Sequence, residues 1–185
     1  MSQIYKLRDW ISQDKISFSL LSSNINPNAI HLLEQNEDKI IWSVLSGNPN
    51  KIAIDLLEQN PDKIDWIYLS GNPNAIHLLE QNRDEINWEW LSKNPNAIHL
   101  LEQNPEKIKW PWLSGNPNAI HILEKNQDKI DWRWLSENPN IFVLNYEYLK
   151  ARTSIIKEEL IMRYWHPSNI EKWLEMYGDD FELYV

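Results

Sequence analysis

Histidine and glutamate recur at fixed spacing, and these are the residue types in this chain that could bind a metal or transfer a proton. The histidines are His31, His77, His99 and His121, with Asp55 at the equivalent second position. A glutamate follows three residues after each, at Glu34, Glu58, Glu80, Glu102 and Glu124. Metal ligands must converge to bonds of about 2.0–2.1 Å, whereas stacked helices lie roughly 8–10 Å apart. Equivalent histidines should therefore line a solvated polar ridge, and no metal or other cofactor is expected.

The same two columns permit other interpretations. Catalytic carboxylates form one pair in a distinct pocket rather than a ladder of equivalents. The glutamates fall at the end of a predicted helix, where the helix dipole disfavours negative charge, so each needs a partner. We expect a lysine (Lys39, Lys63, Lys107, Lys129) or an indole N–H. An exposed imidazole can gain a proton near neutral pH, so His77, His99 and His121 remain candidates for contact with a partner.

Two aromatic columns also repeat. The first is Phe18, Trp42, Trp66, Trp88, Trp110 and Trp132, each two residues after an isoleucine. Its uniformity beside isoleucine predicts core. The second column is Leu20, Val44, Tyr68, Trp90, Trp112 and Trp134. On a helix it lies 200° from the first, so both cannot be fully buried in one seam. Its four aromatics either form an exposed contact ridge or fill the groove between successive helix pairs.

These columns belong to a tandem repeat. The Asn-Pro step recurs at Pro27, Pro49, Pro73, Pro95, Pro117 and Pro139, and the first aromatic column is spaced by 24, 24, 22, 22 and 22 residues. One such unit cannot bury its apolar face alone, so neighbours must stack as a solenoid. We predict an all-α solenoid of about five or six two-helix units. A leucine-rich-repeat-like solenoid, with a period of roughly 20–29 residues, is the alternative.

Each unit should contain two short helices. Helix A follows the Asn-Pro step, with Asn72, Asn94, Asn116 and Asn138 as N-caps and Pro at the first helical position. Asn60, Asn82, Asn104 and Asn126 should close it in the left-handed conformation. Helix B begins at the first aromatic, with Ser17, Asp65, Asn87 and Asp131 as N-caps, and Gly47, Gly71 and Gly115 at its end.

The ends of the chain differ from the repeat. Ile4, Leu7, Trp10 and Ile11 predict a capping helix, so residues 1–140 read as a solenoid with an N-terminal cap. Residues 141–185 read as a C-terminal helical cap. Within it, residues 146–165 carry a helical pattern. Pro167 opens a last helix with Ile170, Trp173, Leu174 and Tyr177 on one face, ended by Gly178.

Composition excludes several classes of function. The chain has 185 residues and a formal net charge of −9, which argues against nucleic acid and anionic membrane surfaces as partners. There is no cysteine, so disulfides and thiolate chemistry are excluded. We find no apolar run near the roughly 18 residues of a membrane span, and no signal-peptide core in the first ten residues. Phosphate-loop, Gly-x-Ser-x-Gly and His-Glu-x-x-His motifs are missing, so no enzyme is expected.

The repeat unit carries a resemblance to a known group of proteins. Asn-Pro-Asn-Ala-Ile-His-Leu-Leu-Glu, followed by Asp-Lys-Ile-Asp-Trp and Leu-Ser, resembles the short tandem repeats of proteins from giant nucleocytoplasmic large DNA viruses. The tail His166-Pro167-Ser168-Asn169-Ile170 with Gly178-Asp179 is similar to the closing segment of such proteins. The resemblance covers most of the chain. It implies a viral repeat protein, in the virion or the host cytoplasm, and transfers no catalytic residue.

We therefore expect a non-catalytic protein that binds or scaffolds other proteins. The candidate contact residues are Tyr68, Trp90, Trp112, Trp134, His77, His99 and His121. The acidic charge favours a protein partner with a basic face, and self-association is possible. A minor capsid-associated role in the virion is one alternative. Binding of a glycan or small molecule through the aromatic column is another.

Overall fold

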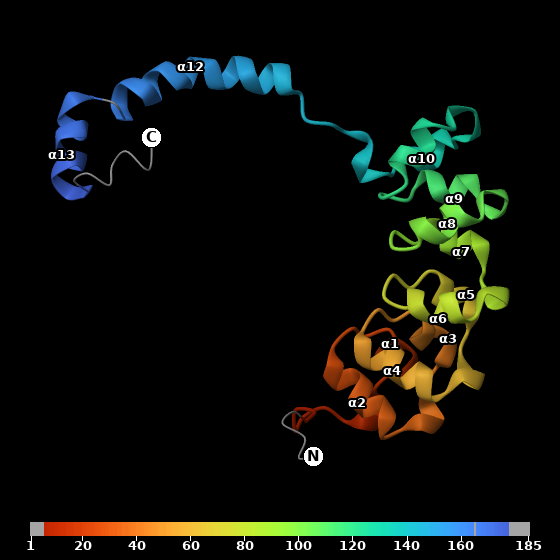
Figure 1. Cartoon of the computed structure of the whole chain (residues 1–185). Helices are drawn as coiled ribbons and strands as arrows, with labels where there is room; N and C mark the ends of the chain where they lie inside the picture. Colours follow the sequence, from red (N-terminus) through yellow and green to blue (C-terminus); the bar gives the residue numbers. More distant parts are fainter. Residues whose placement is uncertain (1–5, 165, 178–185) are drawn as a thin grey trace. The chain divides into compact units, whose positions relative to one another are not determined.

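The computed structural model describes residues 6–164 and 166–177, and this part of the chain is helical without any strand. It divides into two compact units, Met1–Ile141 and Phe142–Val185. The first unit is the predicted α-solenoid: short helices at regular spacing pack against their neighbours along the stack (Figure 1). The leucine-rich alternative is excluded, because it requires a strand in every repeat.

The solenoid alternates two kinds of helix. Those that start at the first aromatic column, here called B helices, are α1 (Phe18–Ser22), α3 (Trp42–Ser46), α5 (Trp66–Ser70), α7 (Trp88–Lys93), α9 (Trp110–Ser114) and α11 (Trp132–Leu135). The A helices are α2 (Pro27–Glu34), α4 (Lys51–Gln59), α6 (Ile76–Gln81), α8 (Ile98–Gln103) and α10 (Ile120–Glu124). Single 3-10 turns precede the B helices: η1 (Gln13–Lys15), η2 (Glu37–Lys39), η3 (Pro61–Lys63), η4 (Arg83–Glu85), η5 (Pro105–Lys107) and η6 (Gln127–Lys129).

The predicted ends of the B helices are confirmed. Each begins at the first aromatic residue, and the side chains of Ser17, Asp65, Asn87 and Asp131 accept backbone N–H groups at four of the N-termini. At α3 and α9 the cap positions are Ile41 and Lys109, which provide no such bond. Pro111 is the second residue of α9, where a missing N–H costs nothing.

The A helices begin differently from the prediction in the 22-residue units. There the helix starts at Ile76, Ile98 and Ile120, four residues after the asparagine expected to cap it. Asn72 instead accepts the N–H of Asn74 and so caps a turn. The two 24-residue units do have a capped A helix, but Asn26 and Asn50 supply the cap.

The closing asparagines also act differently from the prediction. Asn60, Asn82 and Asn104 are C-cap residues, but their φ angles are −130°, −130° and −134°, which is not the left-handed region. Each side-chain Nδ2 donates to the carbonyl four residues earlier, at 2.8–2.9 Å. The last A helix ends one residue sooner, at a Lys125 C-cap, yet Asn126 donates to Ile122 in the same way. The side chain thus satisfies a carbonyl that the helix end leaves free.

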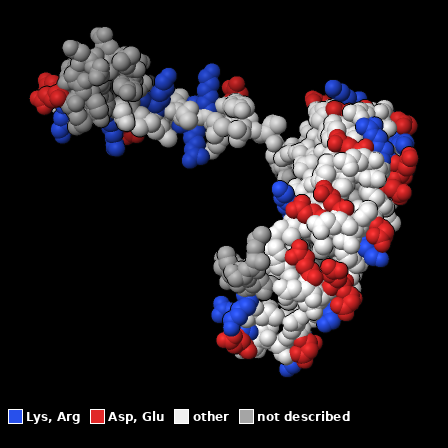
Figure 2. Space-filling view, turned by 60° about the horizontal axis from the view of Figure 1, so that its bottom comes forward, with Lys and Arg blue, Asp and Glu red and all other residues white. Residues whose placement is uncertain are grey.

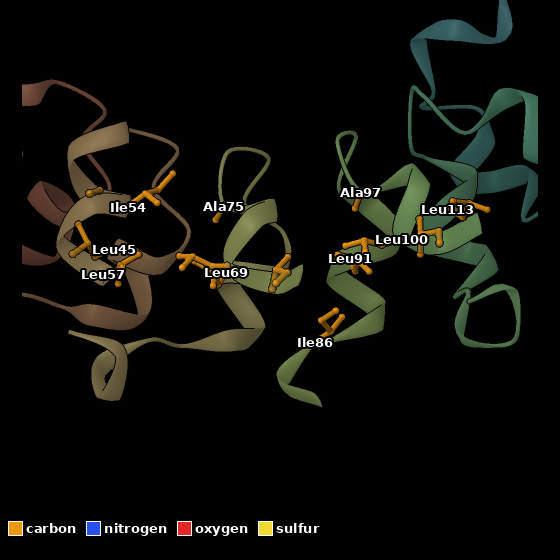
Figure 3. Packing of buried hydrophobic residues seen from close by; sticks show 14 of the residues in the cluster. Leu45, Ile54, Leu57, Leu69, Ala75, Ile86, Leu91, Ala97, Leu100 and Leu113 are labelled. Carbon is orange, nitrogen blue, oxygen red and sulfur yellow. The ribbon is translucent and has the colours of Figure 1, made fainter. Parts of the chain in front are cut away.

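A row of leucines forms the core of the solenoid. Each inner B helix contributes one completely buried leucine, such as Leu69 or Leu91, which packs against A-helix leucines such as Leu57 and Leu79. Figure 3 shows this row continuing from one unit to the next. The first aromatic column, predicted as core, packs against this row but is only half-buried, and Trp132 is 65% exposed. Leucine, rather than tryptophan, therefore fills the centre of each unit.

Four hydrogen bonds repeat at each of the five junctions between successive units, and we call this set the junction lattice. In the junction between α5 and α7, the buried Asn94 donates to the carbonyls of Ser70 and Asn72. Asn96 donates to the carbonyl of Pro73, and the backbone N–H of Asn87 donates to Ser70 Oγ. The equivalent bonds occur at every other junction.

The N-terminal cap is not helical in the described residues. Residues 6–12 contain a turn but no helix, and Trp10 is 80% exposed; Ile4 lies outside the described part. The second unit consists of α12 (Tyr146–Tyr164) and α13 (Pro167–Tyr177), close to the predicted ranges. The predicted face of α13 cannot be followed, because the side chains of Trp173, Leu174 and Tyr177 lie outside the described ones, as does Gly178.

The junction lattice predicts unequal costs for two neighbouring asparagines. Asn94→Ala removes three bonds of a buried amide, two donated and one accepted, and leaves two buried carbonyls short of a donor, so we expect a loss of about 3 kcal/mol. Asn96→Ala removes one exposed inter-unit bond and should cost about 1 kcal/mol. Urea unfolding followed by circular dichroism measures both. Equal costs would contradict the role given to the buried amide.

Candidate functional site

The second aromatic column forms one continuous stack, which we call the aromatic ladder (Tyr68, Trp90, Trp112 and Trp134). Ring centroids are 5.6 Å apart for Tyr68 and Trp90, with an interplanar angle of 46°. The two tryptophan pairs are 6.2 and 5.6 Å apart, with angles of 24° and 25°. These are the distances at which aromatic pairs attract each other beyond simple burial. The ladder therefore links four consecutive B helices, α5, α7, α9 and α11.

Each ring of the ladder packs over the end of the preceding B helix. At Gly71, which ends α5, an added Cβ would lie 2.8 Å from Cε3 of Trp90. The φ of Gly71 is −84°, which any residue can adopt. Close approach of the indole, rather than backbone conformation, therefore requires glycine here. In the next unit Lys93 replaces the glycine, and its Nζ lies 5.9 Å from the ring centroid of Trp112.

The ladder combines the two interpretations that the sequence left open. Tyr68 is 44% exposed, and the three tryptophans are half-buried. Their faces are occupied by neighbouring rings, so the inner rungs present edges to solvent. A sugar ring stacks on an open aromatic face, and Trp90 and Trp112 have rings on both sides. This geometry favours contact with the edges of several rings at once.

An exposed column lies beside the ladder on the same B helices. It is formed by Ile67, Glu89, Pro111 and Arg133, all exposed. These side chains differ in every unit, whereas the ladder and the core repeat. Ile67 and Tyr68, both large and about half exposed, extend the apolar surface at α5. We call the aromatic ladder with this column the B face.

The histidine column bridges successive A helices. Nε2 of His77 lies 2.6 Å from Glu58, that of His99 2.9 Å from Glu80, and that of His121 3.0 Å from Glu102. The partner predicted for these glutamates, a lysine or an indole, is therefore wrong. The bridging side chains are about half exposed, so they remain at the surface as predicted.

Three of the four lysines instead cover rings of the first aromatic column, whereas Lys63 pairs with Asp62. Nζ of Lys39 lies 4.9 Å from the ring centroid of Phe18. Lys107 lies 4.7 Å from Trp88, and Lys129 4.7 Å from Trp110. In each case the lysine belongs to the unit that follows the ring. These cation–π contacts cover three of the half-buried rings of the column on the side that the core leaves open.

Asp55 interrupts the bridges at the second unit. In the other units the equivalent glutamate pairs with a histidine of the next A helix, so Glu34 would meet Asp55. Two carboxylates provide no hydrogen-bond donor for each other. Glu34 instead accepts from its own helix, with Nδ1 of His31 at 2.8 Å. Asp55 lines a groove between α4 and α6 together with Lys51, Glu58 and His77. The groove lies where the unit length changes from 24 to 22 residues.

The described residues offer few routes to chemistry. No group of three or more His, Asp or Glu side chains converges on a possible metal position in residues 6–164 and 166–177. Over the same part of the chain, every buried side-chain nitrogen and oxygen has a hydrogen-bond partner. None of the described helices combines the length and apolar character needed to cross a membrane.

The fold and the B face define an all-α repeat protein of the solenoid class. No model of a known protein family matches the chain, and neither a curated protein nor a solved structure matches it.

The sequence pattern indicated the ladder and the histidines, but it did not indicate that the buried asparagines join successive units. Asn48, Asn72, Asn94, Asn116 and Asn138 are all almost completely buried. So are the serines Ser22, Ser46, Ser70, Ser92 and Ser114. Their burial could have been inferred from the repeat, because a polar residue that is the same in every copy must meet the same partner in each.

Glycine substitutions test how closely the ladder packs. Gly71→Ala should destabilise the protein by about 1–2 kcal/mol, because the indole of Trp90 must move. At Gly47 and Gly115 the nearest heavy atoms are 3.6 and 3.7 Å from an added Cβ, so alanine should be neutral or stabilise by up to about 1 kcal/mol. Urea unfolding gives the energies, and near-ultraviolet circular dichroism reports the ladder. Equal effects at the three sites would contradict the packing described.

Restoring the missing histidine should complete the bridges. Asp55→His provides Glu34 with a partner on the next helix, and we expect a gain of about 0.5 kcal/mol, as for other exposed pairs. The control is the same substitution with Glu34→Gln, in which the gain should shrink. Thermal unfolding of the four proteins gives the coupling. A gain that is independent of residue 34 would show that removal of the Asp55 charge alone is responsible.

Proposed function

We propose that this chain is a non-catalytic recognition protein that binds a protein partner through its B face. The observation that carries the proposal is the pairing of a constant, partly exposed aromatic ladder with a neighbouring column that differs in every unit. The constant part supplies contact area, and the varied part supplies discrimination. Tyrosine and tryptophan are enriched among the residues that dominate binding energy at protein interfaces.

The dimensions of the B face favour a protein over a small ligand. It extends across α5, α7, α9 and α11, as expected for the extended binding surfaces of solenoids. The net charge of −9 favours a partner with a basic face, because complementary charge mainly raises the rate of association. Figure 2 shows acidic side chains spread along the solenoid, with wide uncharged areas between them.

The bridged histidines offer a second contact surface. His77, His99 and His121 use Nε2 for the bridge, and no partner is present for Nδ1 in the described part of the chain. A partner that reaches the A helices would meet these nitrogens at regular spacing. The viral setting, in the virion or the host cytoplasm, rests on the resemblance of the repeat unit alone.

Variants of the exposed column test the proposal without disturbing the ladder. Ile67→Ser, Glu89→Ser and Arg133→Ser change exposed side chains, so the triple variant should keep the helical signal and the unfolding midpoint. The matched control replaces Arg83, Asp84 and Gln127, exposed residues of the 3-10 turns η4 and η6, with serine, which leaves the net charge unchanged as the triple variant does. Tagged wild type and both variants are used for capture from infected or host cells, followed by mass spectrometry. A captured protein is then purified and titrated against all three.

The expected result is a partner whose affinity falls at least about tenfold for the triple variant, as loss of one contact residue of about 2 kcal/mol would already produce. The control should bind as the wild type does. A partner that binds all three proteins equally would remove the B face from the proposal. A catalysed conversion of the partner that depends on this protein would replace recognition by an enzyme.

A further inference from the structure

The junction lattice has a direction. At every junction the unit nearer the C-terminus donates all four hydrogen bonds, and the preceding unit accepts them. The donors are two asparagine amides and one backbone N–H, and the acceptors are three carbonyls and one serine hydroxyl. Asparagine-to-carbonyl distances are 2.7–3.1 Å throughout. A stack built this way ends in two unlike edges.

The edge at α11 presents the acceptors. Ser136 Oγ donates to the carbonyl of Trp132 at 2.7 Å, as its equivalents do, but no N–H of residues 6–164 or 166–177 is donated to it. Its counterparts Ser92 and Ser114 are completely buried, whereas Ser136 is exposed. The carbonyls of Ser136, Asn138 and Pro139 occupy the positions that accept asparagine amides in every earlier unit, and no amide among the same described residues is donated to them.

The edge at α1 presents the donors. Asn24 and Asn26 use their Oδ1 atoms to accept the N–H groups of Asn26 and Asn28, at 2.9 Å each. Their Nδ2 groups have no acceptor in the described part of the chain, although the equivalent groups of Asn48 and Asn50 bind the preceding unit. The backbone N–H of Ser17 corresponds to that of Ile41, which donates to Ser22 Oγ, and it too has no acceptor there.

A groove of about 700 Å³ lies at this donor edge, lined by Lys6, Leu7 and Arg8 together with Asn24 and Asn26. None of residues 6–8 accepts a hydrogen bond from the two amides. The two edges together hold one complete junction lattice, with its donors and its acceptors at opposite ends of the solenoid.

Side chains outside the lattice are complementary in the same way. Among the described residues no lysine covers Trp132, Trp42 or Trp66, whereas Trp88 and Trp110 each receive one from the next unit. Lys15 ends η1 just as Lys39 ends η2, so it is the matching lysine at the donor edge. The column of the aromatic ladder also reaches both edges. At the donor edge it begins with Leu20, which is 72% exposed, and at the acceptor edge it ends with Trp134.

We propose that a second copy of this chain occupies these edges, with the donor edge of one copy bound to the acceptor edge of another. Asn24 and Asn26 would donate to the carbonyls at residues 136, 138 and 139, and Lys15 would cover Trp132. No other partner is specified by the same four bonds in the same register. The contact is heterologous, so an assembly of any length keeps one free donor edge and one free acceptor edge at its two ends, and linear assemblies that grow with concentration follow.

Two double variants, one at each edge, test this proposal in the full-length chain. Asn24→Asp with Asn26→Asp keeps both Oδ1 acceptors needed for the local turn and removes both Nδ2 donors. Trp132→Lys with Ser136→Lys changes two exposed side chains, opposes Lys15 and blocks the acceptor edge. Gln59→Glu with Gln81→Glu adds the same charge as the first pair on the exposed side of the A helices, as the control.

Sedimentation equilibrium from about 1 μM to about 1 mM protein, at 0.15 M salt to screen the repulsion between acidic copies, measures the assembly. Wild type and the control should gain mass with concentration. Each edge variant should associate at least about tenfold more weakly. An equimolar mixture of the two edge variants should recover a single 1:1 dimer that grows no further, because one intact edge of each kind remains. Circular dichroism checks that all variants stay helical.

Several results would overturn the proposal. A wild type that stays monomeric throughout would show that the edges remain open or are covered within the chain. A closed dimer that both edge variants still form would indicate a symmetric contact elsewhere. Failure of the mixture to dimerise, or an equal loss of assembly in the control, would remove the complementarity of the edges as the cause.

Discussion

A buried asparagine amide with two N–H groups must find two acceptors, and this requirement sets the spacing of the solenoid. In each inner unit the amide reaches two carbonyls of the preceding unit, while its own oxygen holds the turn before helix A. A unit that shifted far enough to break these bonds would leave polar groups unsatisfied where water cannot reach them. The distances of 5.6–6.2 Å between ring centroids in the aromatic ladder, and the His–Glu bridges, therefore follow from one fixed spacing of the units.

The lattice also tolerates units of different length. In the two 24-residue units the extra residues are absorbed before helix A, which then begins directly after Asn26 or Asn50. The junction bonds keep the same donors and acceptors, although the sequence separation between them rises by up to two residues. The groove beside Asp55 lies at the change in unit length.

Local signals were enough to predict much of the fold. The starts of four B helices and the glycine ends of three follow from cap chemistry within a few residues of the chain, and the leucine stripe follows from helical periodicity. Asn72 was misread as a helix N-cap because its neighbour is a proline, while its real acceptors lie 24 and 26 residues away. The partner of Glu80 was missed for the same reason, since His99 belongs to the next unit. The pattern within one unit places the aromatic column on its helix, but whether its rings stack depends on the spacing between units, which cannot be deduced from one unit alone.

Most junction bonds end on main-chain carbonyls, which every residue type provides. A new unit inserted between two existing ones would therefore find its acceptors already in place, and would offer the same acceptors to the unit after it. Duplication or loss of a whole unit would leave the remaining junctions intact, and each added unit would bring one more rung and one more variable side chain to the B face. Such a protein can change the length of its binding surface by duplication or deletion of whole units in its gene, without any further substitution at the junctions.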